Sequence, residues 1–233
     1  MLAGIGQPSH SFLLFHKAGG SEQPPAQFKG GGRVAITVKV KNLEAVAQRL
    51  QKQSDLAEKA IKATANDMRN RIPSWVATEV TGTYNIKKSE VMPAKKGKDG
   101  KLTKAVGNIA ARGVTVNSVQ IVYQGRVLTP VHFGMKPKKL TPGAKGRKRK
   151  AITAEIKKGQ RKALHSDAFL GSNRGGGYIP FKRSGPKRYP IESIKTVSLP
   201  QMVENETVYE KIQKVINTGL SKRLEHNIKR FIK

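Results

Sequence analysis

The stretch "RSGPKRYPIESIKTVSLPQM", Arg183–Met202, is rich in proline for a segment that leads into a helical pattern. It contains Pro186, Pro190 and Pro200, and an alternating, half-apolar segment lies between the last two. Proline donates no backbone N–H to a ladder, so it marks the end of a strand or the edge of a sheet. The stretch therefore predicts a loop, an edge strand, a sharp turn and a long helix. A neighbouring copy of the protein can extend such an edge strand.

Helical periodicity is present on both sides of the chain's centre. Apolar residues recur at a spacing of about 3.6 within residues 43–72 and again within residues 205–231. Pro73 predicts a stop or a kink in the first helix, and Trp75, the only tryptophan, predicts a packing anchor there. Gly219 weakens the second helix by about 1 kcal/mol relative to alanine, unless a neighbouring side chain packs against it.

Strand patterns lie before and between these helical segments. The stretch "RVAITVKVK", Arg33–Lys41, alternates at period two and predicts a half-buried strand. Residues 114–128 predict one or two strands around a turn at Gln124-Gly125. The stretch "GSNRGGGYIPFKRSG", Gly171–Gly185, predicts a glycine-rich hairpin. Together the patterns predict an α+β fold, in which two long amphipathic helices pack on an antiparallel β-sheet.

The organisation along the chain follows from composition. Residues 1–32 contain many glycines and prolines and little periodicity, which predicts an irregular N-terminal arm. Residues 33–233 predict a single α+β domain with basic, flexible loops.

The net charge indicates the class of partner. The 233 residues include 45 Lys and Arg against 15 Asp and Glu, a formal net charge of +30. Such a charge favours a polyanion: DNA, RNA, an anionic membrane or an acidic protein surface. A phosphate backbone would relieve the mutual repulsion and release counterions. Few aromatic residues accompany the basic ones, and no sequence-reading motif is present, so we expect any nucleic-acid contact to be nonspecific.

Two lysine- and arginine-rich stretches, residues 87–104 and 136–150, predict exposed loops. A solvated surface is the alternative interpretation of each stretch. The predicted contacts with nucleic acid or an acidic partner are Lys95, Lys96, Lys98, Lys101, Lys104, Lys145, Arg147, Lys148, Arg149 and Lys150.

Side chains typical of catalysis and metal binding are sparse. The chain has no cysteine, which excludes disulfides and thiolate metal sites and fits a reducing compartment. Its five histidines are scattered, and only His165 and Asp167 form a close pair. We therefore predict no catalytic site, no metal and no cofactor.

No apolar run approaches the length of a membrane helix, about 20 residues, which predicts a protein made on the cytoplasmic side without membrane contact.

The sequence around the opening stretch resembles the minor tail protein Z family of long-tailed bacteriophages and prophages. The resemblance covers about residues 40–233, and residues 1–32 lie outside it. The motif Arg188-Tyr189-Pro190-Ile191 is the more specific part. The matching segments are "RYPIESIKTVSLPQMVEN", "VYEKIQKVINTGLSKRLEHNIKRFIK", "NLEAVAQRLQKQSDLAEKAIKATANDMRNRI", "VATEVTGTYNIKKSEV", the basic mid-chain loop and "AFL" at Ala168–Leu170.

This resemblance implies a structural virion protein, made in the host cytoplasm, that acts in tail completion at the head-proximal (neck) end of the tail. Implied partners are the tail terminator, the connector proteins and further copies of the chain in a ring, with nonspecific DNA contact through the basic loops. We expect the edge strand to lie at a subunit contact, although a strand buried within one subunit remains the alternative. The predicted subunit-contact residues are Tyr189, Pro190, Ile191, Ile194 and Val197.

Two other classes of function stay open at this point. A free, sequence-nonspecific nucleic-acid-binding protein would explain the charge, and it should bind DNA or RNA as a purified monomer or dimer. A nuclease is a weaker alternative, because the chain lacks the acidic cluster that such metal chemistry needs.

Overall fold

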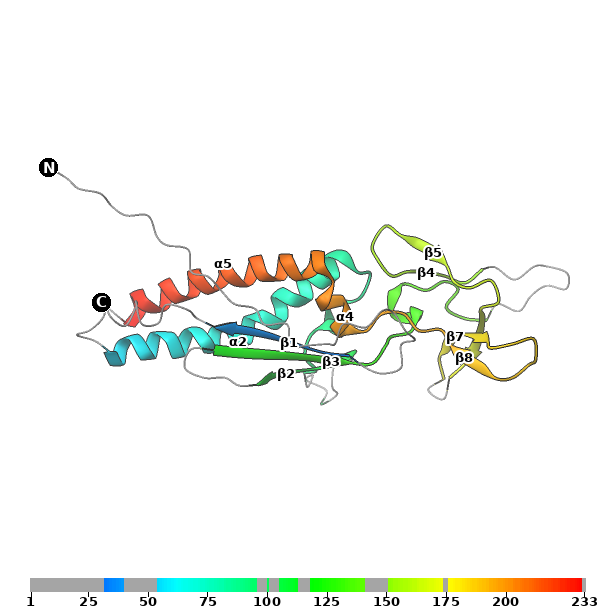
Figure 1. The fold of residues 1–233 in the computed structure, drawn as a ribbon, viewed down its shortest axis with the longest axis horizontal. Coiled ribbons are helices and arrows are strands. Elements are labelled where there is room, and N and C mark those ends of the chain that lie inside the picture. Colours follow the sequence, from blue (N-terminus) through cyan, green and yellow to red (C-terminus); the bar gives the residue numbers. More distant parts are fainter. Residues whose placement is uncertain are drawn as a thin grey trace.

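The computed structural model describes residues 32–39, 54–95, 100, 105–112, 118–140, 151–173 and 176–231. It is elongated, with two long helices and a three-stranded sheet at one end and short strands at the other (Figure 1). We call the first part the body, and we call residues 134–195 the basic lobe. The predicted N-terminal arm lies outside the described residues except for Gly32, which begins the first strand.

The α+β class predicted from the sequence is confirmed. The body contains β1 (Gly32–Lys39), α2 (Ser54–Thr83), α3 (Lys88–Val91), β2 (Gly107–Arg112), β3 (Ser118–Gly125), the 3-10 helix η1 (Pro130–Phe133), α4 (Leu199–Glu204) and α5 (Glu206–Phe231). The basic lobe contains β4 (Thr153–Glu155), β5 (Arg161–Ala163), β6 (Phe169–Ser172), β7 (Tyr178–Arg183) and β8 (Ile191–Ser193).

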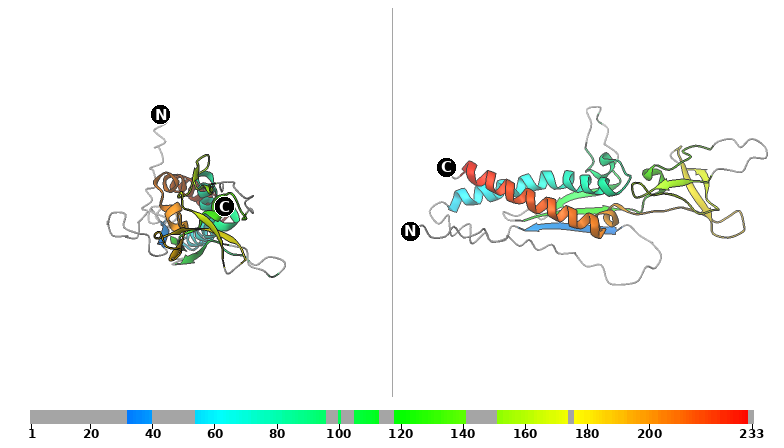
Figure 2. Two further views of the ribbon diagram at one scale, coloured as in Figure 1. Left: turned by 90° about the vertical axis from the view of Figure 1, so that its right-hand side faces the viewer. Right: turned by 90° about the horizontal axis from the view of Figure 1, so that it is seen from above.

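The body's core lies between the helices and the sheet. Helices α2 and α5 lie side by side, as both views in Figure 2 and the contacts between them show. Helix α2 also packs on β3, whereas α4 packs on β1 and β3. The fully buried side chains include Met68 and Ile72 of α2, Ile121 of β3, and Ile212 and Ile216 of α5. The stripe predicted for α5 is therefore its buried face.

Helix α2 differs from its prediction at the described end. The predicted start near residue 43 lies outside the described residues. The stop predicted at Pro73 is wrong, because α2 continues to Thr83; a kink at Pro73 stays a prediction. Proline removes one backbone donor and disfavours the helix interior. Here Val76 and Val80 continue the buried stripe beyond Pro73. Burial of these side chains outweighs the local penalty of the proline.

The main sheet has the order β1-β3-β2 and is antiparallel throughout. Ile36 of β1 pairs with Ile121 of β3, and both are buried. The turn predicted at Gln124-Gly125 is wrong, because β3 extends through both residues and pairs with β1 and β2 there. Backbone pairing with two neighbouring strands, which local sequence does not reveal, determines where β3 ends.

The basic lobe contains two further antiparallel sheets, β4-β5 and β6-β7-β8. The predicted glycine-rich hairpin is confirmed as β6 and β7, in which Phe169 pairs with Phe181. Strand β8 is an edge strand of three residues, shorter than the alternating pattern suggested. Pro200 does not mark a strand end, because it lies in the first turn of α4, where Ser198 and Gln201 form a capping box.

Candidate nucleic-acid interface

The charge of the chain is concentrated in the basic lobe. Residues 134–195 contain 18 Lys and Arg and 3 Asp and Glu, a net charge of +15 and so half of the chain's +30. Many of the described cations among them are exposed. Both Figure 1 and the right-hand view in Figure 2 place the described strands of this lobe at one end of the long axis, beyond the ends of α2 and α5. The described residues of the lobe include 12 Lys and Arg against 3 Asp and Glu, so this end of the molecule is cationic.

Most of the predicted phosphate-contact residues lie outside the described residues. Only Lys95 is described, and it is exposed shortly after α3. The structure therefore does not locate the others, which are Lys96, Lys98, Lys101, Lys104, Lys145, Arg147, Lys148, Arg149 and Lys150.

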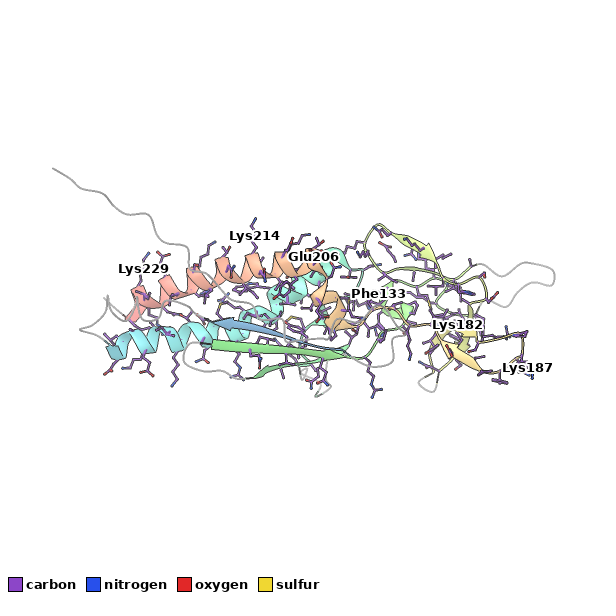
Figure 3. All side chains as sticks on the ribbon, in the orientation of Figure 1. Phe133, Lys182, Lys187, Glu206, Lys214 and Lys229 are labelled. Atoms are coloured by element: carbon purple, nitrogen blue, oxygen red, sulfur yellow. The ribbon has the colours of Figure 1, made fainter. Side chains whose placement is uncertain are left out.

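A second group of cations, which the sequence analysis missed, lies at the connection between β7 and β8. Lys182, Arg183, Lys187 and Arg188 are all exposed. Figure 3 shows Lys182 and Lys187 at the end of the molecule away from the helices. The Ser184 N–H donates to the Pro190 carbonyl at 3.2 Å and closes the loop between the strands. We call residues 182–192 the basic hairpin.

The cations of the basic hairpin differ from the paired cation nearby. Arg161 on β5 contacts Glu155 on β4 at 3.2 Å, which offsets one charge of each sign. By contrast, none of the four hairpin cations forms an ion pair with a residue that the structure describes. The one acidic residue of the hairpin, Glu192, lies opposite Lys182 in the β7–β8 register. The hairpin therefore keeps most of its positive charge available to a partner.

Two of the hairpin's arginines lie close to aromatic rings. The Arg183 guanidinium lies 4.9 Å from the centre of the Phe169 ring, and Phe169 stacks on Phe181 with 6.1 Å between ring centres. A side chain at Gly171 would come within 2.8 Å of the Phe181 ring, so glycine lets that ring lie flat on the sheet. The Arg188 guanidinium lies 5.7 Å from the centre of the Tyr189 ring.

The sequence contained part of the signal for this cluster. Alternation along β7 puts Phe181 and Arg183 on one face of the strand, as residues two apart. The contact with Phe169 depends on the pairing of β6 with β7, which alternation alone does not give. Aromatic residues are few in the chain as a whole, but Phe169, Phe181 and Tyr189 lie beside the cations of the hairpin.

The five residues predicted for a subunit contact do not share one environment. Tyr189 is 64% exposed and Ile191 36% exposed, and Pro190 is also exposed. Ile194 is half-buried, and Val197 packs against the core of the body. The first three therefore belong to the basic hairpin, whereas Val197 belongs to the segment that joins the lobe to α4.

The histidine pairs show no arrangement typical of a metal centre. His132 Nδ1 lies 3.0 Å from Glu90 Oε2, and His165 Nδ1 lies 3.6 Å from Asp167 Oδ2 on the surface. In the ranges that the structure describes, no group of three or more His, Cys, Asp or Glu side chains could hold a metal ion. Within the same ranges, no helix is both long and apolar enough to cross a bilayer.

Comparison with known proteins identifies the family. The family model described as prophage minor tail protein Z (GPZ) matches residues 39–233, which include all of the helices described above and the whole basic lobe. The comparisons with curated proteins and with solved structures found no match. The matched region covers most of the chain and includes the basic hairpin, whereas all of β1 except Lys39 lies outside it. The chain belongs to the prophage minor tail protein Z family and is a structural component of a bacteriophage tail.

Proposed function

We propose that the protein completes the tail at its head-proximal (neck) end, where several copies form a ring that contacts DNA. Family membership supports a structural role in the tail. The observation that supports the DNA contact is the excess of cations among the described residues of the basic lobe, 12 Lys and Arg against 3 Asp and Glu, at one end of an elongated molecule. A ring of such chains could direct its basic lobes toward the path of the DNA.

The proposed partners follow from this position. The tail terminator and the connector proteins would contact the body, and neighbouring copies would contact one another. Strand β8 offers an unpaired backbone edge within the described sheet β6-β7-β8, to which an extended segment of a neighbour could add. This edge is our candidate for the subunit contact.

The first experiment removes charge from the predicted loop. Replacing Lys145, Arg147, Lys148, Arg149 and Lys150 with serine should weaken DNA binding without regard to base sequence. The log–log salt dependence should flatten by about 0.9 for each lost duplex phosphate contact. In infected cells, tails should still assemble but should fail to join heads or to hold the DNA end. Unchanged binding and an unchanged slope would mean that the loop is a solvated surface or contacts an acidic protein.

A fractionation experiment separates this proposal from a free nucleic-acid-binding protein. A tail component should co-purify with tails and should fractionate with virions after nuclease treatment. A free DNA-binding protein should remain with cellular nucleic acid and be absent from purified particles. Absence from nuclease-treated virions would therefore contradict the proposed function even if the purified chain bound DNA.

A further inference from the structure

We propose that the basic hairpin, residues 182–192, is a binding site for the phosphate backbone of DNA. The proposal rests on the DNA contact suggested above but assigns it to described residues outside the two loops identified in the sequence. These residues are Lys182, Arg183, Lys187 and Arg188, with Tyr189 beside them. Lysine and arginine on an exposed surface are the usual phosphate contacts of proteins that bind DNA without sequence preference.

The first argument is electrostatic. Four exposed cations lie within seven consecutive residues, and none is paired with a described carboxylate. Like charges at this spacing repel one another, and the described residues of the lobe, hairpin included, have a net charge of +9 from 12 Lys and Arg and 3 Asp and Glu. Binding of a polyanion would remove the repulsion and release the counterions that now offset it. The charge of the hairpin is therefore complementary to that of a phosphate backbone.

The second argument is that the hairpin is held in a defined shape. Strand β7 is hydrogen-bonded on both sides, to β6 and to β8, and the Ile194 N–H donates to the Pro180 carbonyl at 2.9 Å. The Phe169 ring, fixed by its stack on Phe181, holds the Arg183 guanidinium on the outer face of the sheet. Less side-chain freedom is lost on binding when a cation is already positioned in this way.

The third argument concerns Tyr189, whose ring is 64% exposed at the end of the loop. An exposed ring next to an arginine is a platform on which an unpaired base can stack. Duplex and single-stranded DNA share the phosphate chemistry that we propose. Only the single strand would use the Tyr189 ring, so the two forms can be distinguished by experiment.

Charge repulsion disfavours a second basic hairpin as the partner of this surface. Two identical hairpins would bring four cations of each copy together, so a direct contact between two hairpins is unfavourable. A subunit contact at this sheet would therefore have to join the backbone edge of β8 to a part of the neighbouring chain other than its basic hairpin. An acidic protein surface would satisfy the charge, and its binding is an outcome of the test that would overturn the proposal.

The test compares two double variants of the full chain with equal charge loss. The first, Lys187→Gln with Arg188→Gln, changes the hairpin. The control, Lys211→Gln with Lys214→Gln, removes two exposed lysines from α5; Figure 3 shows Lys214 on the helix, far from Lys187. Binding to a short duplex of random sequence and to its single strand is measured against salt concentration. We expect the hairpin variant to lower the duplex slope by about 1.8, that is, by about 0.9 per phosphate contact, and the control to leave it near the wild-type value.

Two single variants make the proposal more specific. Tyr189→Ser should weaken binding to the single strand by roughly fivefold or more, the effect of losing one stacked base, and should change duplex binding much less. Glu192→Gln removes the one acidic residue of the hairpin and should strengthen binding to both forms. Because it adds affinity, a local loss of structure cannot mimic the result.

Several results would overturn the proposal. Equal loss in the hairpin and α5 variants would show that DNA responds only to total charge. Wild-type DNA binding by the hairpin variant, combined with loss of binding to an acidic tail protein, would assign the hairpin to that protein. Either result leaves the proposed tail role intact, because that role is judged by the presence of the chain in nuclease-treated virions. Conversely, a chain absent from virions but dependent on the hairpin for DNA binding would contradict only the tail role.

Discussion

Gly219 of α5 lies directly under the ring of Trp75 of α2. A methyl group at position 219 would come within 3.0 Å of three carbon atoms of that ring. This contact explains why a helix that packs along α2 contains a glycine, which by itself lowers helix stability by about 1 kcal/mol relative to alanine. It also confirms that Trp75 is a packing anchor, although the helix does not end there.

We expect Gly219→Ala to lower the free energy of unfolding by about 1–3 kcal/mol, because overpacking outweighs the gain in helix propensity. Gly82 is the matched control, since it lies in α2 with open space around it. Gly82→Ala should raise the free energy of unfolding by up to about 1 kcal/mol. Denaturant unfolding of the two variants measures both effects, and stabilisation by both would contradict the packing of Trp75 on α5.

Tyr123 of β3 is fully buried, and its hydroxyl has no hydrogen-bond partner among the described residues. Burial raises the pKa of Tyr123 above its ordinary value of 10.0. The folded protein therefore keeps the proton at a pH where the unfolded chain releases it. Ionisation of Tyr123 therefore does not change the free energy of unfolding below about pH 10. Above that pH, the same group makes the free energy of unfolding fall as the pH rises.

Tyr123→Phe should remove this contribution. At neutral pH the variant should be as stable as the wild type or more stable by about 1 kcal/mol, because a buried hydroxyl without a partner is lost. Above pH 10 its stability should fall less steeply than that of the wild type. Chemical unfolding at both pH values measures the difference, with exposed Tyr189→Phe as the control. Identical alkaline profiles for Tyr123→Phe and wild type would show that the hydroxyl is not buried.

At the scale of elements, a buried polar contact fixes how α5 lies along α2. The Asn227 side-chain amide donates to Thr64 Oγ1 at 3.0 Å and to Asp67 Oδ2 at 3.3 Å. Asn227 and Thr64 are both buried. A polar contact inside an otherwise apolar interface favours one register of the two helices, since a shift would leave these groups without partners.

We expect Asn227→Ala to lower the free energy of unfolding by about 1–3 kcal/mol, because it leaves part of this contact unsatisfied. Asn217→Ala, at an exposed position of the same helix, should change it by less than about 0.5 kcal/mol. Thermal or denaturant unfolding distinguishes the two variants. An Asn227→Ala variant as stable as Asn217→Ala would contradict the register of the helix pair.

The elements also show what could be predicted from the sequence. Helix α5 could be predicted to within a residue, because its apolar stripe and its acidic start and basic end agree. The end of α2 could not, since Pro73 is a strong local signal and the burial that overrides it depends on distant partners. The division into three sheets was missed for the same reason, because alternation predicts strands but not their neighbours. The cations of the basic hairpin could be read from the sequence. The contact between Arg183 and Phe169 could not, because it depends on the register between β6 and β7.

At the scale of the whole molecule, charge and shape are arranged along the same axis. The body contains the apolar core and the interface between α2 and α5, whereas the basic lobe has only a small core around Met135, Ile152 and Leu170. A lobe whose described residues have a small core and an excess of nine positive charges is suited to contact a polyanion. This division leads us to assign the contacts with other tail proteins to the body and the DNA contact to the lobe, with the backbone edge of β8 as the candidate contact between copies.

A cryo-EM map of the assembled, DNA-filled particle tests the central claim most directly. We predict density for several copies of the chain at the head-proximal end of the tail, with residues 134–195 of each copy directed toward the DNA. Density for the chain at the opposite end of the tail would contradict the proposed position. Lobes directed away from the DNA, with the basic hairpin against another protein, would contradict the proposed DNA contact.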